Sequence, residues 1–132
     1  MNAKQFLMIG GIILLVVGIL GFIPGIIGPT PSQSIFGDTW WFDMGENWAH
    51  TILGIVALLL AFAAPTMVQK WITVLLGIIG VAIGVYSFFT PLFLGANLEN
   101  PADSILHIVI GLWALAAGFM TKEAAGAKSA AA

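Results

Sequence analysis

Four long stretches of apolar residues dominate the pattern of the chain. They cover Phe6–Ile23, Trp48–Ala64, Trp71–Phe89 and Ser104–Met120, and none of them contains Asp, Glu, Lys or Arg. At a rise of about 1.5 Å per residue, helices of this length span close to the ~30 Å hydrocarbon core of a bilayer. The regular alternation of a membrane-spanning β-strand is missing. The pattern therefore predicts four transmembrane α-helices in one domain that covers residues 1–132.

Composition supports a membrane location. Of the 132 residues, 60% are hydrophobic and only 8% are charged, whereas a soluble domain carries about 25% charged residues. Lipid must replace water over most of the surface, so the bilayer is an expected partner. The chain has no arginine and a net charge of −2, which argues against nucleic acid as a partner because phosphate binding needs several basic side chains.

The charged residues predict an orientation. All four lysines fall on one side of the predicted membrane: Lys4, Lys70, Lys122 and Lys128. The long connections 24–47 and 90–103 contain no basic residue and hold five acids: Asp38, Asp43, Glu46, Glu99 and Asp103. By the positive-inside rule the lysine side is cytoplasmic. We therefore expect a multi-pass protein of the inner (cytoplasmic) cell membrane with both termini in the cytoplasm and residues 121–132 as a flexible tail.

The two halves of the chain resemble each other. The segment 46–58 aligns without a gap with 103–115, and an acid, a histidine, a glycine, an alanine and a leucine recur at the same places. The first and third apolar stretches share a glycine spacing, carried by Gly11 and Gly18, then Gly77 and Gly84. Both units cross the membrane in the same direction. The expected fold class is an all-α integral membrane protein built from two parallel two-helix repeats, related by an axis along the membrane normal.

Helix-start signals precede the second and fourth stretches. Asp43 with Glu46 three residues later is a capping-box pattern. Asn100 is the expected N-cap of the last helix, with Pro101 in the first helical position.

Each of these helices then places a histidine four residues after an acid. Glu46 precedes His50, and Asp103 precedes His107. The spacing puts each acid and its histidine on one helix face, so we expect the carboxylate to hold one ring nitrogen.

A stripe of small residues continues below each histidine. Its members are Gly54, Ala57 and Ala61 in the second stretch, and Gly111, Ala114 and Gly118 in the fourth. Small residues at this spacing let helix backbones approach closely, which is a main source of helix association in lipid. The stripe predicts the packed face, and we expect His50 and His107 to point into protein.

Several roles fit two inward-facing histidines. The structural role is to hydrogen-bond a neighbouring helix and fix its register. As cofactor ligands, His50 and His107 would bind haem or a chlorophyll-type pigment, with Glu46 and Asp103 as their supporting carboxylates. A divalent metal site and a short proton relay are further possibilities. Catalysis is not expected, since the chain has no cysteine and no motif for an activated nucleophile or a phosphate loop.

Tryptophans gather near the predicted membrane boundaries. Trp40, Trp41 and Trp48 lie at the outer boundary and Trp71 at the inner one. We interpret them as the aromatic belt of a membrane protein.

The start of the last helix carries a resemblance to a known family. The segment Glu99-Asn-Pro-Ala-Asp-Ser-Ile-Leu-His107-Ile-Val-Ile-Gly111 resembles the signature of small bacterial four-helix membrane proteins of the domain-of-unknown-function 4383 family. The matching positions are Asn100, Asp103, His107 and Gly111, with His50 and Gly54 as a weaker copy. The resemblance implies the four-helix layout and brings no activity with it.

The sequence thus favours a non-enzymatic function. We expect a small structural or accessory subunit, without a cofactor, that forms homo-oligomers or packs into a larger membrane complex. The alternative is a subunit that binds haem or a chlorophyll-type pigment through His50 and His107. A small channel or transporter is a third hypothesis, which the absence of charge within the spans disfavours.

Overall fold

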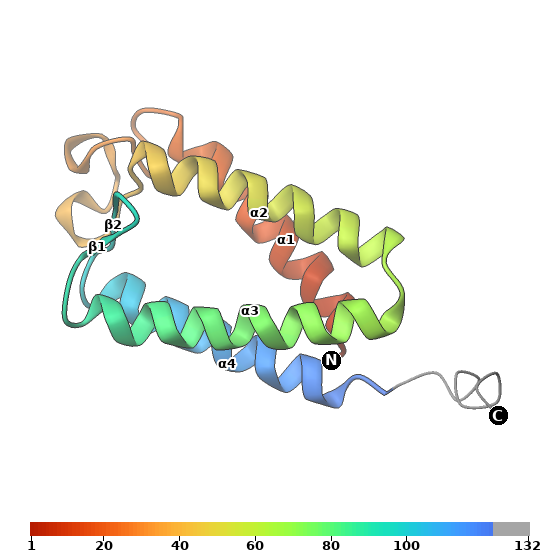
Figure 1. Cartoon of the computed structure of the whole chain (residues 1–132). Coiled ribbons are helices and arrows are strands. Elements are labelled where there is room, and N and C mark those ends of the chain that lie inside the picture. Colours follow the sequence, from red (N-terminus) through yellow and green to blue (C-terminus); the bar gives the residue numbers. More distant parts are fainter. Residues whose placement is uncertain (123–132) are drawn as a thin grey trace, which may run out of the picture.

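The described part of the chain contains four long helices. The computed structural model describes residues 1–122 and has α1 at Ala3–Gly21, α2 at Met44–Ala63, α3 at Thr66–Ser87 and α4 at Ala102–Met120 (Figure 1). All four are long and apolar enough to cross a membrane. This is the layout of a multi-pass membrane protein, as the apolar stretches predict.

Polar residues extend the helices beyond the predicted stretches. α2 begins at Met44 rather than Trp48, and α3 begins at Thr66 rather than Trp71. The earlier start of α2 follows from the capping box, in which Asp43 accepts the backbone N–H of Glu46 at 2.9 Å. Hydropathy locates the apolar middle of a helix, whereas its polar first turn is set by the cap.

The helices form two hairpins, α1 with α2 and α3 with α4. Glycines bring the two backbones of each hairpin close together. A Cβ atom at Gly11 would lie 3.1 Å from the carbonyl oxygen of Gly54, and one at Gly77 would lie 2.9 Å from that of Gly111. Gly77 and Gly111 follow Gly11 and Gly54 by 66 and 57 residues. The two hairpins therefore make matching contacts at matching positions.

The stripe of small residues is packed inside the protein. Its six members, Gly54, Ala57, Ala61, Gly111, Ala114 and Gly118, are all buried. Gly54 and Gly111 lie against the first helix of their own hairpin. The alanines contribute to a core that both hairpins share.

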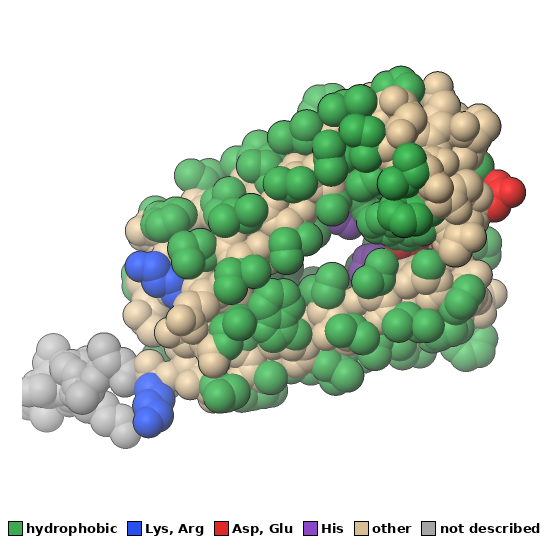
Figure 2. Space-filling model, turned by 180° about the vertical axis from the view of Figure 1, so that it is seen from behind, with side chains coloured by type: hydrophobic (Ala, Val, Ile, Leu, Met, Phe, Trp, Pro, Cys, Tyr) green, Lys and Arg blue, Asp and Glu red, His purple; other side chains and the backbone are tan. Residues whose placement is uncertain are grey.

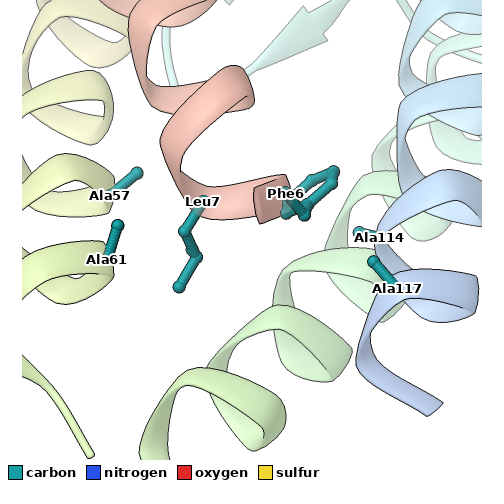
Figure 3. Packing of buried hydrophobic residues seen from close by; sticks show 6 residues of the cluster. All are labelled: Phe6, Leu7, Ala57, Ala61, Ala114 and Ala117. Carbon is teal, nitrogen blue, oxygen red and sulfur yellow. The ribbon is translucent and has the colours of Figure 1, made fainter. Parts of the chain in front are cut away.

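This shared core lies at the end of the molecule that carries the N-terminus, here called the terminal end. Phe6 and Leu7 of α1 lie between the two other helices of the core (Figure 3). Leu7 points toward Ala57 and Ala61 of α2, and Phe6 lies on the side of Ala114 and Ala117 of α4. α1 thus joins the first hairpin to the second.

Thr121 belongs to the folded terminal end and not to a flexible tail. Its side chain is buried, and its hydroxyl accepts the N–H of Ala3 and donates to the carbonyl oxygen of Ala117, both at 2.7 Å. The contact satisfies one of the N–H groups that the first turn of a helix leaves without an intrahelical partner. The expected tail from residue 123 onward lies outside the described residues.

The opposite end, here called the loop end, is covered by the two long connections. The first contains the short 3-10 helices η1 (Pro31–Gln33) and η2 (Gly37–Thr39). The second contains a small antiparallel ribbon of β1 (Leu92–Phe93) and β2 (Ala96–Asn97), with Phe93 opposite Ala96. Ile27 and Phe42 of the first connection are buried.

Between the two ends the hairpins separate. α1 makes contact with α3 and α4, whereas α2 runs apart from them for most of its length (Figure 1). The space-filling view shows an opening between the hairpins, with histidine side chains at its margin (Figure 2). The same view places lysine side chains at the terminal end and acidic ones at the loop end.

Candidate functional site

The site is assembled at the loop end, where the starts of α2 and α4 meet the second connection. The predicted capping box of α2 is present. The N–H of Asp43 donates to Glu46 Oε2, and the N–H of Glu46 donates to Asp43 Oδ1, both at 2.9 Å. Asp43 Oδ2 also accepts the N–H of Asn97 in β2 at 2.7 Å. The cap of the first hairpin is thus tied to the ribbon of the second.

The predicted cap of α4 is wrong. Pro101 occupies the cap position, and no side chain caps the helix there. The amide of Asn100 instead donates to the carbonyl oxygen of Phe88 at 3.3 Å, at the end of α3. The last carbonyls of a helix have no intrahelical donor, and Asn100 supplies one to α3.

Asp103 is held by two donors. Its Oδ2 accepts the N–H of Glu99 at 2.8 Å, and its Oδ1 accepts the indole Nε1–H of Trp40 at 2.9 Å. Trp40 is therefore a hydrogen-bond donor inside the loop end, a role that its interpretation as a belt residue does not include.

Three carboxyl groups converge at this point. Glu46, Glu99 and Asp103 each offer one oxygen, and these oxygens lie within 4.8 Å of one another. All three residues are buried, with exposed fractions of 2%, 8% and 2%. Glu46 Oε1 and Glu99 Oε2 are buried without a hydrogen-bond partner. In the sequence Glu99 stands out as an acid of the second long connection and as the start of the segment 99–111, but not as a site residue.

The electrostatics of this cluster are unfavourable for three full charges. Burial raises the pKa of the Glu99 carboxyl to about 8, and the neighbouring Asp103 adds to the rise. The lysines among the described residues lie at the terminal end: Lys4, Lys70 and Lys122 (Figure 2). The carboxyl cluster therefore has no cationic side chain at its own end of the described molecule.

The histidines lie one helical turn further along. His50 Nδ1 bonds the backbone carbonyl oxygen of Glu46 at 2.7 Å, and His107 Nδ1 bonds that of Asp103 at 2.8 Å. The prediction that each carboxylate holds a ring nitrogen of its histidine is wrong. Helical side chains lean back over the preceding turn, which brings each ring to the carbonyl, while the carboxylates accept hydrogen bonds from other donors.

These bonds fix the role of one nitrogen in each ring. A carbonyl oxygen only accepts hydrogen bonds, so Nδ1 is the donor in each imidazole. Nε2 is the ring nitrogen that this bond leaves available to a ligand. His50 is further oriented by Phe42, whose ring stacks on it at 4.5 Å between centroids.

Both histidines line one cleft between the hairpins. The cleft has a volume of about 280 Å³ and includes Glu46, His50 and His107 in its wall. The rest of the wall is apolar, with Leu53 from α2 and Ile83 from α3 among its side chains. The rings face a space between the hairpins. The stripe of small residues had predicted that they face a tightly packed contact between helices.

Comparison with known proteins adds no relative. No family model, no curated protein and no solved structure matches the chain. Membership of the domain-of-unknown-function 4383 family stays a prediction that rests on the segment 99–111.

Proposed function

We propose that this chain is a non-enzymatic accessory subunit of the cytoplasmic membrane that holds an imidazole-ligated group between its two hairpins. It self-associates or packs into a larger membrane complex, with the loop end outside and both termini in the cytoplasm. The observation that carries the proposal is the matched pair of histidines. His50 and His107 occupy equivalent positions, use Nδ1 in the same backbone bond and line one cleft.

The matched contacts of the hairpins support an internal repeat. Gly18 approaches the Asn47 carbonyl oxygen as Gly84 approaches that of Ser104. Two like units related by a pseudo-twofold axis present like residues to that axis, and a ligand lying on it receives one imidazole from each side. A haem iron can take one imidazole on each side in this way.

The shape of the cleft sets a condition on the ligand. Its 280 Å³ lies just below the range of about 300–1,000 Å³ that is usual for organic ligands. A macrocycle would therefore extend from the cleft into the opening between the hairpins that Figure 2 shows. The apolar wall suits its faces, and the hydrogen bond at Nδ1 makes Nε2 a better ligand.

The test is an absorption spectrum of the purified full-length protein, followed by titration with hemin. We expect saturable binding at one site and the low-spin spectrum of an iron porphyrin with two axial imidazoles. His50→Gln or His107→Gln alone should convert the spectrum to that of a single imidazole, and the double variant should lose binding.

Trp48→Leu is the matched control, because Trp48 is an exposed aromatic residue of α2 outside the cleft. It should bind hemin like the unmodified protein. An unmodified protein that binds no hemin and carries no pigment, or a double His→Gln variant that still binds hemin, would contradict the proposal. In that case a structural role predicts that His→Leu destabilises the fold more than His→Gln, because glutamine keeps a hydrogen-bonding group and leucine does not.

A further inference from the structure

We propose that Glu46, Glu99 and Asp103 form a binding site for a divalent cation of the oxygen-preferring class, with Ca²⁺ as the best fit. The site borders the cleft of the imidazole pair and shares Glu46 with its wall, but the proposal does not depend on the proposed function. The site joins the two hairpins. Glu46 lies in the first turn of α2, Asp103 lies in the first turn of α4, and Glu99 lies just before α4.

Two carboxylate oxygens of the cluster residues are open to a ligand. Glu46 Oε1 and Glu99 Oε2 are buried and have no hydrogen-bond partner. A buried carboxylate oxygen without a partner is costly, so such atoms are rare unless something binds them. Here two of them occur in residues whose carboxyl oxygens converge.

The charge of the cluster also favours a cation. Three carboxyl groups share a buried volume, and the described lysines are at the opposite end of the molecule. Like charges at this spacing cannot all remain ionised without a cation. A divalent ion would neutralise two of the three charges and leave Asp103 with the donors it already has from Glu99 and Trp40.

The spacing of the carboxyl oxygens fits the size of Ca²⁺. Ca²⁺ binds oxygens at about 2.3–2.6 Å, so two ligands on opposite sides of the ion are at most about 5 Å apart. The three oxygens lie within 4.8 Å of one another, which a single Ca²⁺ spans without a rearrangement. Mg²⁺ requires a nearly ideal octahedron at about 2.0–2.1 Å and keeps several of its waters, so a set of three protein carboxylates suits Ca²⁺ better. Water completes the shell of either ion.

The test uses the full-length protein in a micelle of uncharged detergent after treatment with EDTA. Calorimetric titration with CaCl₂ and thermal unfolding at increasing CaCl₂ report binding directly and through stability. We expect saturable binding of one Ca²⁺, a rise in Tm, and a weaker effect of MgCl₂.

Single variants distinguish binding at this site from nonspecific attraction of cations to acidic side chains. Glu46→Gln keeps the capping box, since glutamine also accepts the Asp43 N–H, and Glu99→Gln removes the other open oxygen. Each should weaken Ca²⁺ binding by at least about tenfold. Asp38→Asn removes an acid of the loop end that is not in the cluster, and it should bind Ca²⁺ like the unmodified protein.

The histidines provide the control that separates this inference from the proposed function. The double His50→Gln, His107→Gln variant should keep the Ca²⁺-dependent rise in Tm whether or not hemin binds. No saturable Ca²⁺ binding to the unmodified protein, or undiminished binding to both Glu46→Gln and Glu99→Gln, would overturn the site.

Discussion

Trp40 and Asp103 are 63 residues apart in the chain, yet the indole Nε1–H of Trp40 donates a hydrogen bond to Asp103 Oδ1 at 2.9 Å. The bond joins the connection of the first hairpin to the first turn of α4. Together with the bond from Asn97 to Asp43, it closes the loop end. The hairpins are therefore held together at both ends.

The first prediction concerns this bond. Trp40→Phe keeps an aromatic ring and removes the N–H donor. Hydrogen bonds to charged groups contribute about 1.5–3 kcal/mol, and the half-buried position of Trp40 favours the lower end, so we expect a loss of about 1.5 kcal/mol. Denaturant unfolding in micelles measures it. Trp41→Phe should change little, because the neighbouring indole has no such contact among the described residues; an equal loss for both variants would exclude a specific role for the bond.

The second prediction concerns the glycine seams. A Cβ at Gly18 would lie 2.6 Å from the backbone nitrogen of Thr51, and one at Gly84 would lie 2.7 Å from the Ser104 carbonyl oxygen. Both Gly18→Ala and Gly84→Ala should cost about 1–3 kcal/mol through overpacking. The two hairpins should respond alike.

Gly10→Ala is the control for this pair, since its Cβ would meet nothing nearer than the Phe6 ring at 3.9 Å. Its stability should stay close to that of the unmodified protein or rise slightly, because alanine is the better helix former. Equal tolerance of alanine at Gly10, Gly18 and Gly84 in thermal unfolding would contradict the close approach of the helices.

The third prediction concerns orientation. The chain has no cysteine, so single cysteines can be placed at Thr39 in the loop end and at Thr66, the first residue of α3, both exposed. The one-sided lysines predict that a membrane-impermeant thiol reagent labels Thr39→Cys but not Thr66→Cys in intact cells. Labelling of Thr66→Cys alone would reverse the proposed topology.

The fourth prediction concerns pH. The pKa of Glu99 is raised to about 8 in the fold, whereas an unfolded glutamate titrates near 4.3. The folded state then holds its proton more tightly, so the stabilisation is complete below about pH 4 and is lost as pH rises through about 8. In EDTA, the Tm should fall between pH 5 and pH 8.5, as estimated from these pKa values.

Glu99→Gln should flatten this decline, because glutamine does not titrate. A Tm of the unmodified protein that stays constant or rises across the same pH range would show that Glu99 is ionised without cost in the fold.

Much of the fold follows from local sequence signals. The apolar stretches locate the middle of each helix because lipid requires continuous apolar surface, and the Asp43–Glu46 pair locates the start of α2 because a cap is a local contact. The matched glycines are visible in the sequence for a similar reason, since a close helix crossing depends on residue size.

The site was less predictable because it depends on contacts between distant segments. Glu99 gains its importance only when the second connection brings it beside Glu46, and Trp40 only when its indole reaches Asp103. The histidine positions were visible, but their partners were not. Whether a helical histidine bonds the carboxylate or the carbonyl four residues earlier depends on what else that carboxylate binds.

The most direct test of the account is ¹⁵N NMR of the full-length protein labelled only at histidine, which is clean because the chain has two histidines. The account predicts that both rings are protonated at Nδ1 and unprotonated at Nε2, and that hemin shifts the Nε2 signals of His50 and His107 together. A proton on Nε2 of either ring, or a shift confined to one histidine, would contradict a ligand held jointly by the two hairpins.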